Sequence, residues 1–115
     1  MPFYLSQWIY KDTTVRQMIL QQQNRQEVVR VAIEAFGGKL HSFFFSFDEY
    51  DGLCISEFAD EETAQACLMT VLGQGAVQRI RTTLLFSQEA TIRSIQKAKE
   101  VFGEPGASTP GKTDT

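Results

Sequence analysis

Apolar and polar residues alternate in four short segments of the chain, a pattern typical of β-strands whose two faces differ in exposure. The segments are 3–10, 39–47, 52–58 and 77–86. Only Asp48, Glu49, Tyr50 and Asp51 separate the second segment from the third. The sequence therefore predicts that these two strands form a β-hairpin.

Apolar residues at helical spacing indicate one brief helix after Asp12 and three longer helices after Asn24, Asp60 and Ser87. Asn, Asp and Ser at such positions accept a hydrogen bond from an unpaired N–H of the first helical turn. Glycines at 37–38, 73 and 103 follow the three longer segments and favour helix ends there.

The order of these elements predicts an α+β domain with the ferredoxin-like βαββαβ arrangement and an additional C-terminal helix. Right-handed crossovers would give a four-stranded antiparallel sheet in the spatial order 4-1-3-2, with the helices on one face. We predict a single domain over residues 1–102. Residues 103–115 are mostly Gly, Pro, Ser, Thr and charged residues, so we predict a flexible tail there.

Alternation divides the strands into two rows, and we place one row against the helices and the other on the open face. In this assignment, Gln7 lies on the helix side and Phe58 on the open side. The predicted helix side consists of Leu5, Ile9, Phe43, Phe45, Phe47, Leu53, Ile55, Ile80 and Leu84. The predicted open side consists of Tyr4, Ser6, Trp8, Tyr10, Ser42, Phe44, Ser46, Cys54, Ser56, Arg79 and Arg81.

Aromatic residues are frequent in the row assigned to the open face. A monomer seldom exposes a contiguous apolar patch of more than a few hundred Å², so we expect a second subunit to cover this face. Arg79 and Arg81 would project toward Trp8 and Tyr10, and cations beside aromatic rings suit an aromatic or carboxylated small molecule. Together with Phe44, these are the predicted ligand-binding residues. The arginines could instead pair with acidic residues across the subunit interface.

The composition narrows the classes of partner. A net charge of -3 gives no basic face for nucleic acid, and no apolar run reaches the roughly 18 residues that a membrane span needs. We expect a cytoplasmic protein, because the N-terminus also lacks a signal-like segment.

Two cysteines and one histidine are too few for a structural zinc site, and the usual nucleotide-binding and hydrolase motifs are absent. We therefore predict no metal and no cofactor.

Three residues are candidates for catalysis. His41 is the only side chain whose ordinary pKa lies near neutral pH, although a lone histidine in an edge strand is more often a surface or interface residue. Tyr50 and Asp51 could form an acid/base pair. At the end of a tight hairpin, however, we favour structural roles, in which Asp51 accepts turn amides and Tyr50 packs its ring.

The hairpin carries a resemblance to a known family. Gly37-Gly38-Lys39-Leu40, Ser42-Phe43-Phe44-Phe45-Ser46-Phe47 and Glu49-Tyr50-Asp51 resemble the GYD domain family, as do Ala59-Asp60-Glu61-Glu62 and Thr82-Thr83-Leu84. Asp48 stands where the family signature has glycine, and aspartate tolerates the turn conformation. The resemblance implies a fold like that of the dimeric α+β barrels, in which two open sheets face each other. It implies no particular reaction, because the family's function is largely uncharacterised.

Three functions fit these observations. The first is a homo-oligomeric module that binds a small aromatic or anionic molecule or mediates subunit association through its open sheet face. The second is a cofactor-independent oxygenase or isomerase of the dimeric α+β barrel type, which is an analogy of fold. The third is a structural assembly protein without a pocket.

Overall fold

The computed structural model describes residues 1–103 and contains the four predicted strands, whose ends differ from the predicted ones by at most two residues. The flexible tail predicted from residue 103 onward lies outside the described residues, apart from Gly103. The strands are β1 (Phe3–Tyr10), β2 (Lys39–Phe45), β3 (Gly52–Glu57) and β4 (Val77–Leu85), and the helices are α1 (Asp12–Gln21), α2 (Arg25–Ala35), α3 (Glu61–Gly73) and α4 (Gln88–Phe102).

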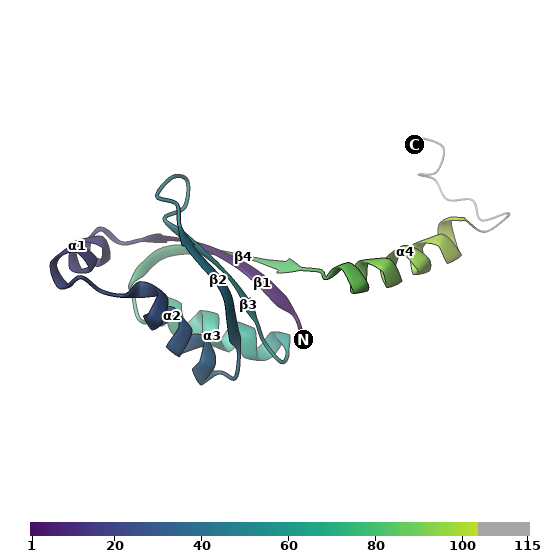
Figure 1. The fold of residues 1–115 in the computed structure, drawn as a ribbon, viewed down its shortest axis with the longest axis horizontal. Coiled ribbons are helices and arrows are strands. Elements are labelled where there is room, and N and C mark those ends of the chain that lie inside the picture. The colour runs from purple at the N-terminus through teal and green to yellow at the C-terminus, as the bar shows by residue number, and fades with distance from the viewer. Residues whose placement is uncertain (104–115) are drawn as a thin grey trace. The chain divides into compact units, whose positions relative to one another are not determined.

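The four strands form one antiparallel sheet in the order β2-β3-β1-β4. This is the predicted order read from the opposite edge, and it confirms the α+β, ferredoxin-like prediction. Helices α2 and α3 lie together on one side of the sheet (Figure 1). Helix α1 precedes α2 in the connection between β1 and β2. The other side of the sheet carries no helix of residues 1–85 (Figure 1).

The three longer helices begin at the predicted caps. The side chain of Asn24 accepts a hydrogen bond from the backbone N–H of Glu27 at 3.1 Å, and Ser87 accepts one from Ala90 at 3.1 Å. Asp60 accepts bonds from both the hydroxyl and the N–H of Thr63, which lower the pKa of its carboxyl. Each cap supplies a partner for an N–H that the helix itself leaves unpaired.

The predicted faces of β1 and β3 are wrong. The row placed on the open face in fact points toward the helices and forms much of the core, with Tyr4, Trp8, Tyr10, Cys54 and Ser56 all buried. The row predicted to meet the helices contains Leu5, Ile9, Leu53 and Ile55. It lies on the opposite face, because alternate residues of a strand point to opposite faces. The pairing agrees, since Leu5 pairs with Ile55 and cross-strand partners share a face.

The predicted face is right for Phe43, which packs against the cluster around Trp8. The predicted face is also right for Ile80 and Leu84 of β4, which pair with Trp8 and Tyr4. The register of β2 is irregular between Leu40 and Ser42, where His41 is the extra residue. A bulge of one residue shifts the alternation of everything beyond it. Strict alternation therefore cannot assign the residues before and after His41 to the correct faces of the sheet.

Residues Met1–Leu85 form one compact unit, and a second unit begins at Phe86 and contains α4. No side chain of α4 is buried, and Ile95 on its apolar stripe is 62% exposed. The prediction of a single domain over residues 1–102 stays a prediction.

Candidate functional site

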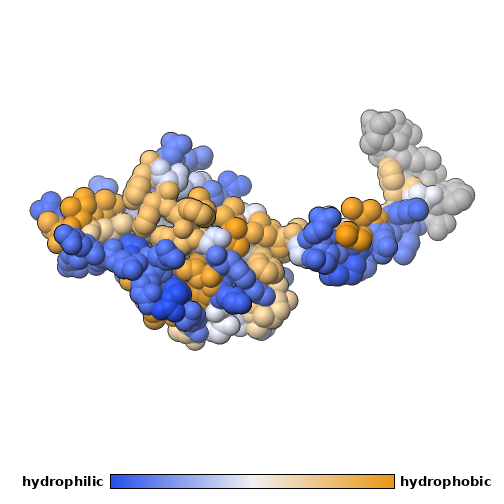
Figure 2. All heavy atoms as spheres, viewed as in Figure 1, coloured by the Kyte–Doolittle hydropathy of each residue, from blue (hydrophilic) through white to orange (hydrophobic). Residues whose placement is uncertain are grey.

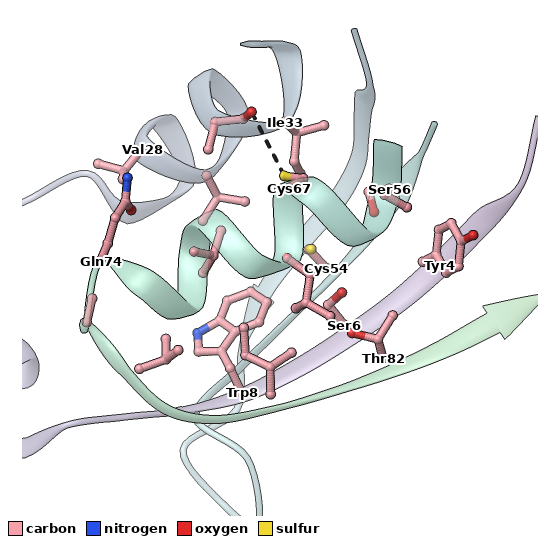
Figure 3. A pocket seen from close by; sticks show the side chains of 18 of the residues that line it. Tyr4, Ser6, Trp8, Val28, Ile33, Cys54, Ser56, Cys67, Gln74 and Thr82 are labelled. Carbon is pink, nitrogen blue, oxygen red and sulfur yellow. Dashed lines mark hydrogen bonds between the residues drawn. The ribbon is translucent and has the colours of Figure 1, made fainter. Parts of the chain in front are cut away.

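A cavity of about 100 Å³ lies between the sheet and helices α2 and α3. The four inward residues of β1 form its floor: Tyr4, Ser6, Trp8 and Tyr10. Figure 3 shows the side chains of Trp8 and Cys54 pointing from the sheet toward α3. The helices contribute an apolar roof that consists of Val28, Val29, Ala32, Ile33, Ala64, Leu68 and Val71, together with Cys67.

The cavity reaches the solvent, because Val28, Gln74 and Thr82 line it and are themselves exposed. Native cores are normally packed as densely as organic crystals. None of the described side chains is buried to more than 98%. The space between the two layers is therefore only partly filled by the chain's own side chains.

Three polar atoms at this site are buried and have no hydrogen-bond partner among the described residues. They are the indole Nε1 of Trp8, the hydroxyl of Tyr10 and Nε of Arg25. The guanidinium carbon of Arg25 lies 5.5 Å from the centroid of the Tyr10 ring, a cation–π contact. Arg25 is the only charged residue among those that line the cavity, within the part of the chain that the structure describes.

Two thiols line the same space, from β3 and α3. Burial raises the pKa of the Cys54 thiol to about 12, and the nearby Cys67 adds to this effect. Burial also raises the pKa of Cys67. Because a thiolate is the reactive form of cysteine, both thiols are protonated and unreactive near neutral pH.

The raised pKa of Cys54 predicts a loss of stability in alkali. Below the ordinary thiol pKa of 9.0 the group is protonated in both states. Above it, the unfolded chain loses the proton while the folded chain keeps it up to about pH 12. The free energy of unfolding should therefore fall between these values, by up to about 1.4 kcal/mol per pH unit from Cys54. Urea denaturation at pH 8 to 10.5 measures the slope.

The Cys54→Ala variant is the control for this prediction, because lysines and tyrosines also titrate in alkali. We expect its stability to be lower at pH 8, since it loses a buried side chain, but to fall less steeply above pH 9. Equal slopes in the two proteins would contradict the prediction.

The predicted ligand-binding residues divide between the two faces of the sheet. Trp8 and Tyr10 line the cavity, whereas Phe44, Arg79 and Arg81 lie in the row on the opposite face. The arginines therefore do not project toward Trp8 and Tyr10, because the face of β1 was assigned wrongly. Instead, the guanidinium carbon of Arg79 lies 6.0 Å from the ring centroid of Tyr50.

The candidate catalytic residues are not brought together. His41 Nε2 lies 2.8 Å from a carboxylate oxygen of Glu57, and its ring is 5.2 Å from that of Phe3. Glu57 is the last residue of β3, whereas Tyr50 and Asp51 directly precede its first residue. His41 thus lies at the opposite end of β3 from the other two candidates.

Asp51 ties the hairpin to the end of β1. Its carboxylate accepts a hydrogen bond from the backbone N–H of Tyr10 at 2.8 Å, and its own N–H donates to the carbonyl of Trp8 at 2.8 Å. Its carbonyl accepts from the N–H groups of Ser46 and Phe47. The carboxylate thus accepts a strand amide and not the turn amides that we predict for it, and the turn amides bond to its backbone carbonyl.

Replacing Asp51 with Ala should lower the free energy of unfolding by about 1–3 kcal/mol, because the partly buried N–H of Tyr10 loses its partner. The Asp51→Asn variant keeps an acceptor oxygen and should lose less than half as much. Asp48→Ala, at an exposed position of the same turn, should change stability by no more than about 0.5 kcal/mol. Urea denaturation of the three variants checks this order. Equal stability of Asp51→Ala and the unaltered protein would refute the role.

The face of the sheet opposite α2 and α3, here called the outer face, is largely apolar. Its row includes Phe3, Leu5, Ile9, Phe44, Leu53 and Ile55. Phe44 is 62% exposed. The hairpin beside this face is hydrophilic at its tip and apolar below it (Figure 2). No element of residues 1–85 covers the outer face.

Sequence reasoning missed most of the cavity. The sequence predicts Cys54, Ser56 and Phe58 on the open face or at its end, and it does not single out Arg25, whereas all four line the cavity. The available signal was the row from Tyr4 to Tyr10, which combines large aromatic rings with the small Ser6. When helices pack against large aromatic rings that flank a small side chain, the space above the small side chain stays unfilled.

The sheet order, the helices on one face and the cavity beneath them define an α+β protein with a ferredoxin-like sheet. The GYD domain model matches residues 4–95, and the chain belongs to the GYD domain family. The crystal structure of a structural genomics target protein from Agrobacterium tumefaciens is similar, with a TM-score of 0.47 and 8% sequence identity. The similarity covers 78% of this chain and 97% of that one. No curated protein matches the chain.

Two further findings concern location and metals. Among the described residues, no helix combines the length and the apolar character needed to cross a membrane. Residues 1–103 contain no group of three or more His, Cys, Asp or Glu side chains that could hold a metal ion. The cytoplasmic location stays a prediction.

Proposed function

We propose that the protein binds a small molecule in the cavity between its sheet and helices α2 and α3. The observation that carries this proposal is an unfilled apolar space that opens to solvent, lined by residues whose buried donors have no partner among the described residues. Ligand sites typically combine apolar walls with a few convergent polar groups. The interior of a domain without a ligand site rarely keeps both an open space and unpaired polar atoms.

Trp8 makes this proposal directly testable, because it is the only tryptophan and lines the cavity. An uncharged single-ring compound, toluene, should change the fluorescence of Trp8 in a saturable way. Ala32→Leu adds side-chain volume inside the cavity and should abolish this change, whereas Ala35→Leu, on the exposed side of the same helix, should leave it intact. A linear, non-saturable response in all three proteins would refute binding in the cavity.

The cavity would also serve the second function, a cofactor-independent oxygenase or isomerase. The three candidate catalytic residues, His41, Tyr50 and Asp51, do not line it, and both lining thiols are held protonated. These observations favour binding over catalysis. If the protein converts a bound aromatic compound, and if the rate is unchanged in His41→Ala and Tyr50→Phe, the activity belongs to other residues.

We further propose that the outer face associates with a second copy of the chain. Arg79 and Arg81 on this face form no salt bridge with the described residues, nor do Asp48 and Glu49 on the hairpin. A two-fold axis brings the same patch of both subunits together, so each copy could supply the carboxylates that the other's arginines lack. Light scattering at tens of micromolar should give the mass of a dimer or higher oligomer, and a monomer would overturn this proposal.

The two proposals can be separated. An oligomer that binds no single-ring compound in the cavity would favour the structural assembly function. A monomer that binds toluene next to Trp8 would retain the ligand site and remove the need for a subunit interface.

A further inference from the structure

The chemical class of the ligand can be inferred from the unpaired polar atoms of three residues that line the cavity. Trp8 and Tyr10 are only 5% and 3% exposed, and the Nε1 atom of one and the hydroxyl of the other have no partner. A buried polar group left unpaired costs about 1–3 kcal/mol. Nε of Arg25 is the third such atom at the same site. Indole and guanidinium N–H groups only donate, and a hydroxyl can donate, so the missing partner is an acceptor.

The charge of the residues that line the cavity is also unbalanced. Arg25 contacts the Tyr10 ring, and no Asp or Glu among the described residues lines the cavity. Arg25 is the first residue of α2, so the positive end of that helix dipole lies at the same place. The carboxylate of Asp51 binds the backbone N–H of Tyr10 and does not line the cavity. The unpaired donors and the positive charge, which share Arg25, thus favour an anionic acceptor.

The remainder of the cavity sets the body of the ligand. Most of the other lining residues are apolar, such as Val29, Ile33 and Leu68, and no second charged residue is among the lining residues that the structure describes. The space of about 100 Å³ is smaller than the cavity of about 150 Å³ that holds benzene. A short chain fits it, or a single ring that extends into its open mouth, and nothing much larger does.

We propose that the cavity binds a small monocarboxylate with an apolar body, whose carboxylate lies between Arg25, the Tyr10 hydroxyl and the Trp8 indole N–H. This inference rests on the proposed function, because it concerns the same cavity. It adds the charge of the ligand and the residues that recognise it.

The test compares phenylacetate with phenylacetamide, which have nearly the same shape and differ in charge, by titration against Trp8 fluorescence. Phenylacetate should bind at least tenfold more tightly. In Arg25→Gln this preference should fall to less than twofold, and in Arg25→Lys, which keeps the charge but loses the planar fork, it should be intermediate. Arg16→Gln, at an exposed position of α1 that does not line the cavity, should keep the full preference.

Tyr10→Phe gives a readout that a purely structural role would not produce. It should weaken phenylacetate binding several-fold without lowering the Tm of the ligand-free protein, because the hydroxyl that it removes has no partner there. A lower Tm in this variant, with unchanged phenylacetate binding, would overturn the assignment of the hydroxyl to the ligand.

The outcomes separate the anionic ligand from the ligand site itself. Equal affinity for acid and amide in the unaltered protein would overturn the anion inference and leave the proposed function standing. Failure of both compounds and of toluene to bind would overturn both. Should Arg25→Gln prove unfolded by circular dichroism, Arg25→Lys and Tyr10→Phe still decide the matter, because undiminished preference in both would contradict the inference.

Discussion

Replacing Gly52 with Ala is expected to lower the free energy of unfolding by about 2–3 kcal/mol, and the Tm by roughly 10 °C. Gly52 pairs with Trp8 across the strands, and the indole lies directly over it. A Cβ at position 52 would lie 2.7 Å from Cζ2 of Trp8 and 2.9 Å from its Nε1. The ring is buried and contacts Tyr10 and Phe43, so a shift away from the added Cβ, into the cavity that it lines, would break these contacts. Thermal and urea denaturation measure the loss.

The matched control is Gly73→Ala at the last residue of α3, where an added Cβ would meet nothing within 4 Å. It should be neutral or slightly stabilising, since Ala restricts the unfolded chain more than Gly does. In a Trp8→Phe background, where the ring is smaller, Gly52→Ala should cost less than in the unaltered protein. A double-mutant cycle without such coupling would show that the close approach of Trp8 is not the cause.

Replacing Phe44 with Glu is expected to raise the dissociation constant of the proposed dimer at least 100-fold. Phe44 is the most exposed large apolar side chain of the outer-face row, and a carboxylate there would have to be buried without a partner when two copies meet. A 100-fold change corresponds to about 2.7 kcal/mol, within the range found for aromatic residues central to interfaces. Analytical ultracentrifugation over a concentration series measures the constant.

Met69→Glu is the matched control for this prediction, because Met69 is 65% exposed but belongs to α3, on the other side of the sheet. It adds the same charge and should leave association unchanged. If both variants weaken association equally, the interface does not lie on the outer face. If neither does, Phe44 is not part of it.

Local chemistry explains why much of the fold could be predicted from the sequence. Asn24, Asp60 and Ser87 cap helices through contacts within four residues, so their roles follow from short-range rules. The strand order follows from the sequence of elements and the handedness of crossovers. None of these steps requires knowledge of which face of the sheet is buried.

The faces of β1 and β3 could not be predicted in the same way, because both rows of these strands are mostly apolar. Hydrophobicity separates a core row from a solvent row only when one of them is polar. The two residues that fitted poorly, Gln7 on the supposed helix side and Phe58 on the supposed open side, were the signal of the true phase. Phe58 is 4% exposed in the core.

The cavity depends on distances that no local pattern records. Arg25 and Tyr10 meet only because α2 packs over the end of β1, and neither residue belongs to a motif. Its aromatic floor was recognised as a candidate ligand surface, and Trp8 and Tyr10 do line the cavity, although on the other face from the one expected. The residue types indicated a ligand surface, but the sequence did not indicate toward which face of the sheet these side chains point.

The bulge at His41 has a consequence for aggregation. Strand β2 is at one edge of the sheet, where a regular row of unpaired N–H and C=O groups would invite another chain to add a strand. The irregularity between Leu40 and Ser42 interrupts that row, and Lys39 adds a charge at its start. Natural sheets use both features to block strand addition. We therefore expect this edge to resist growth into fibrils, even though three neighbouring phenylalanines stand on the strand.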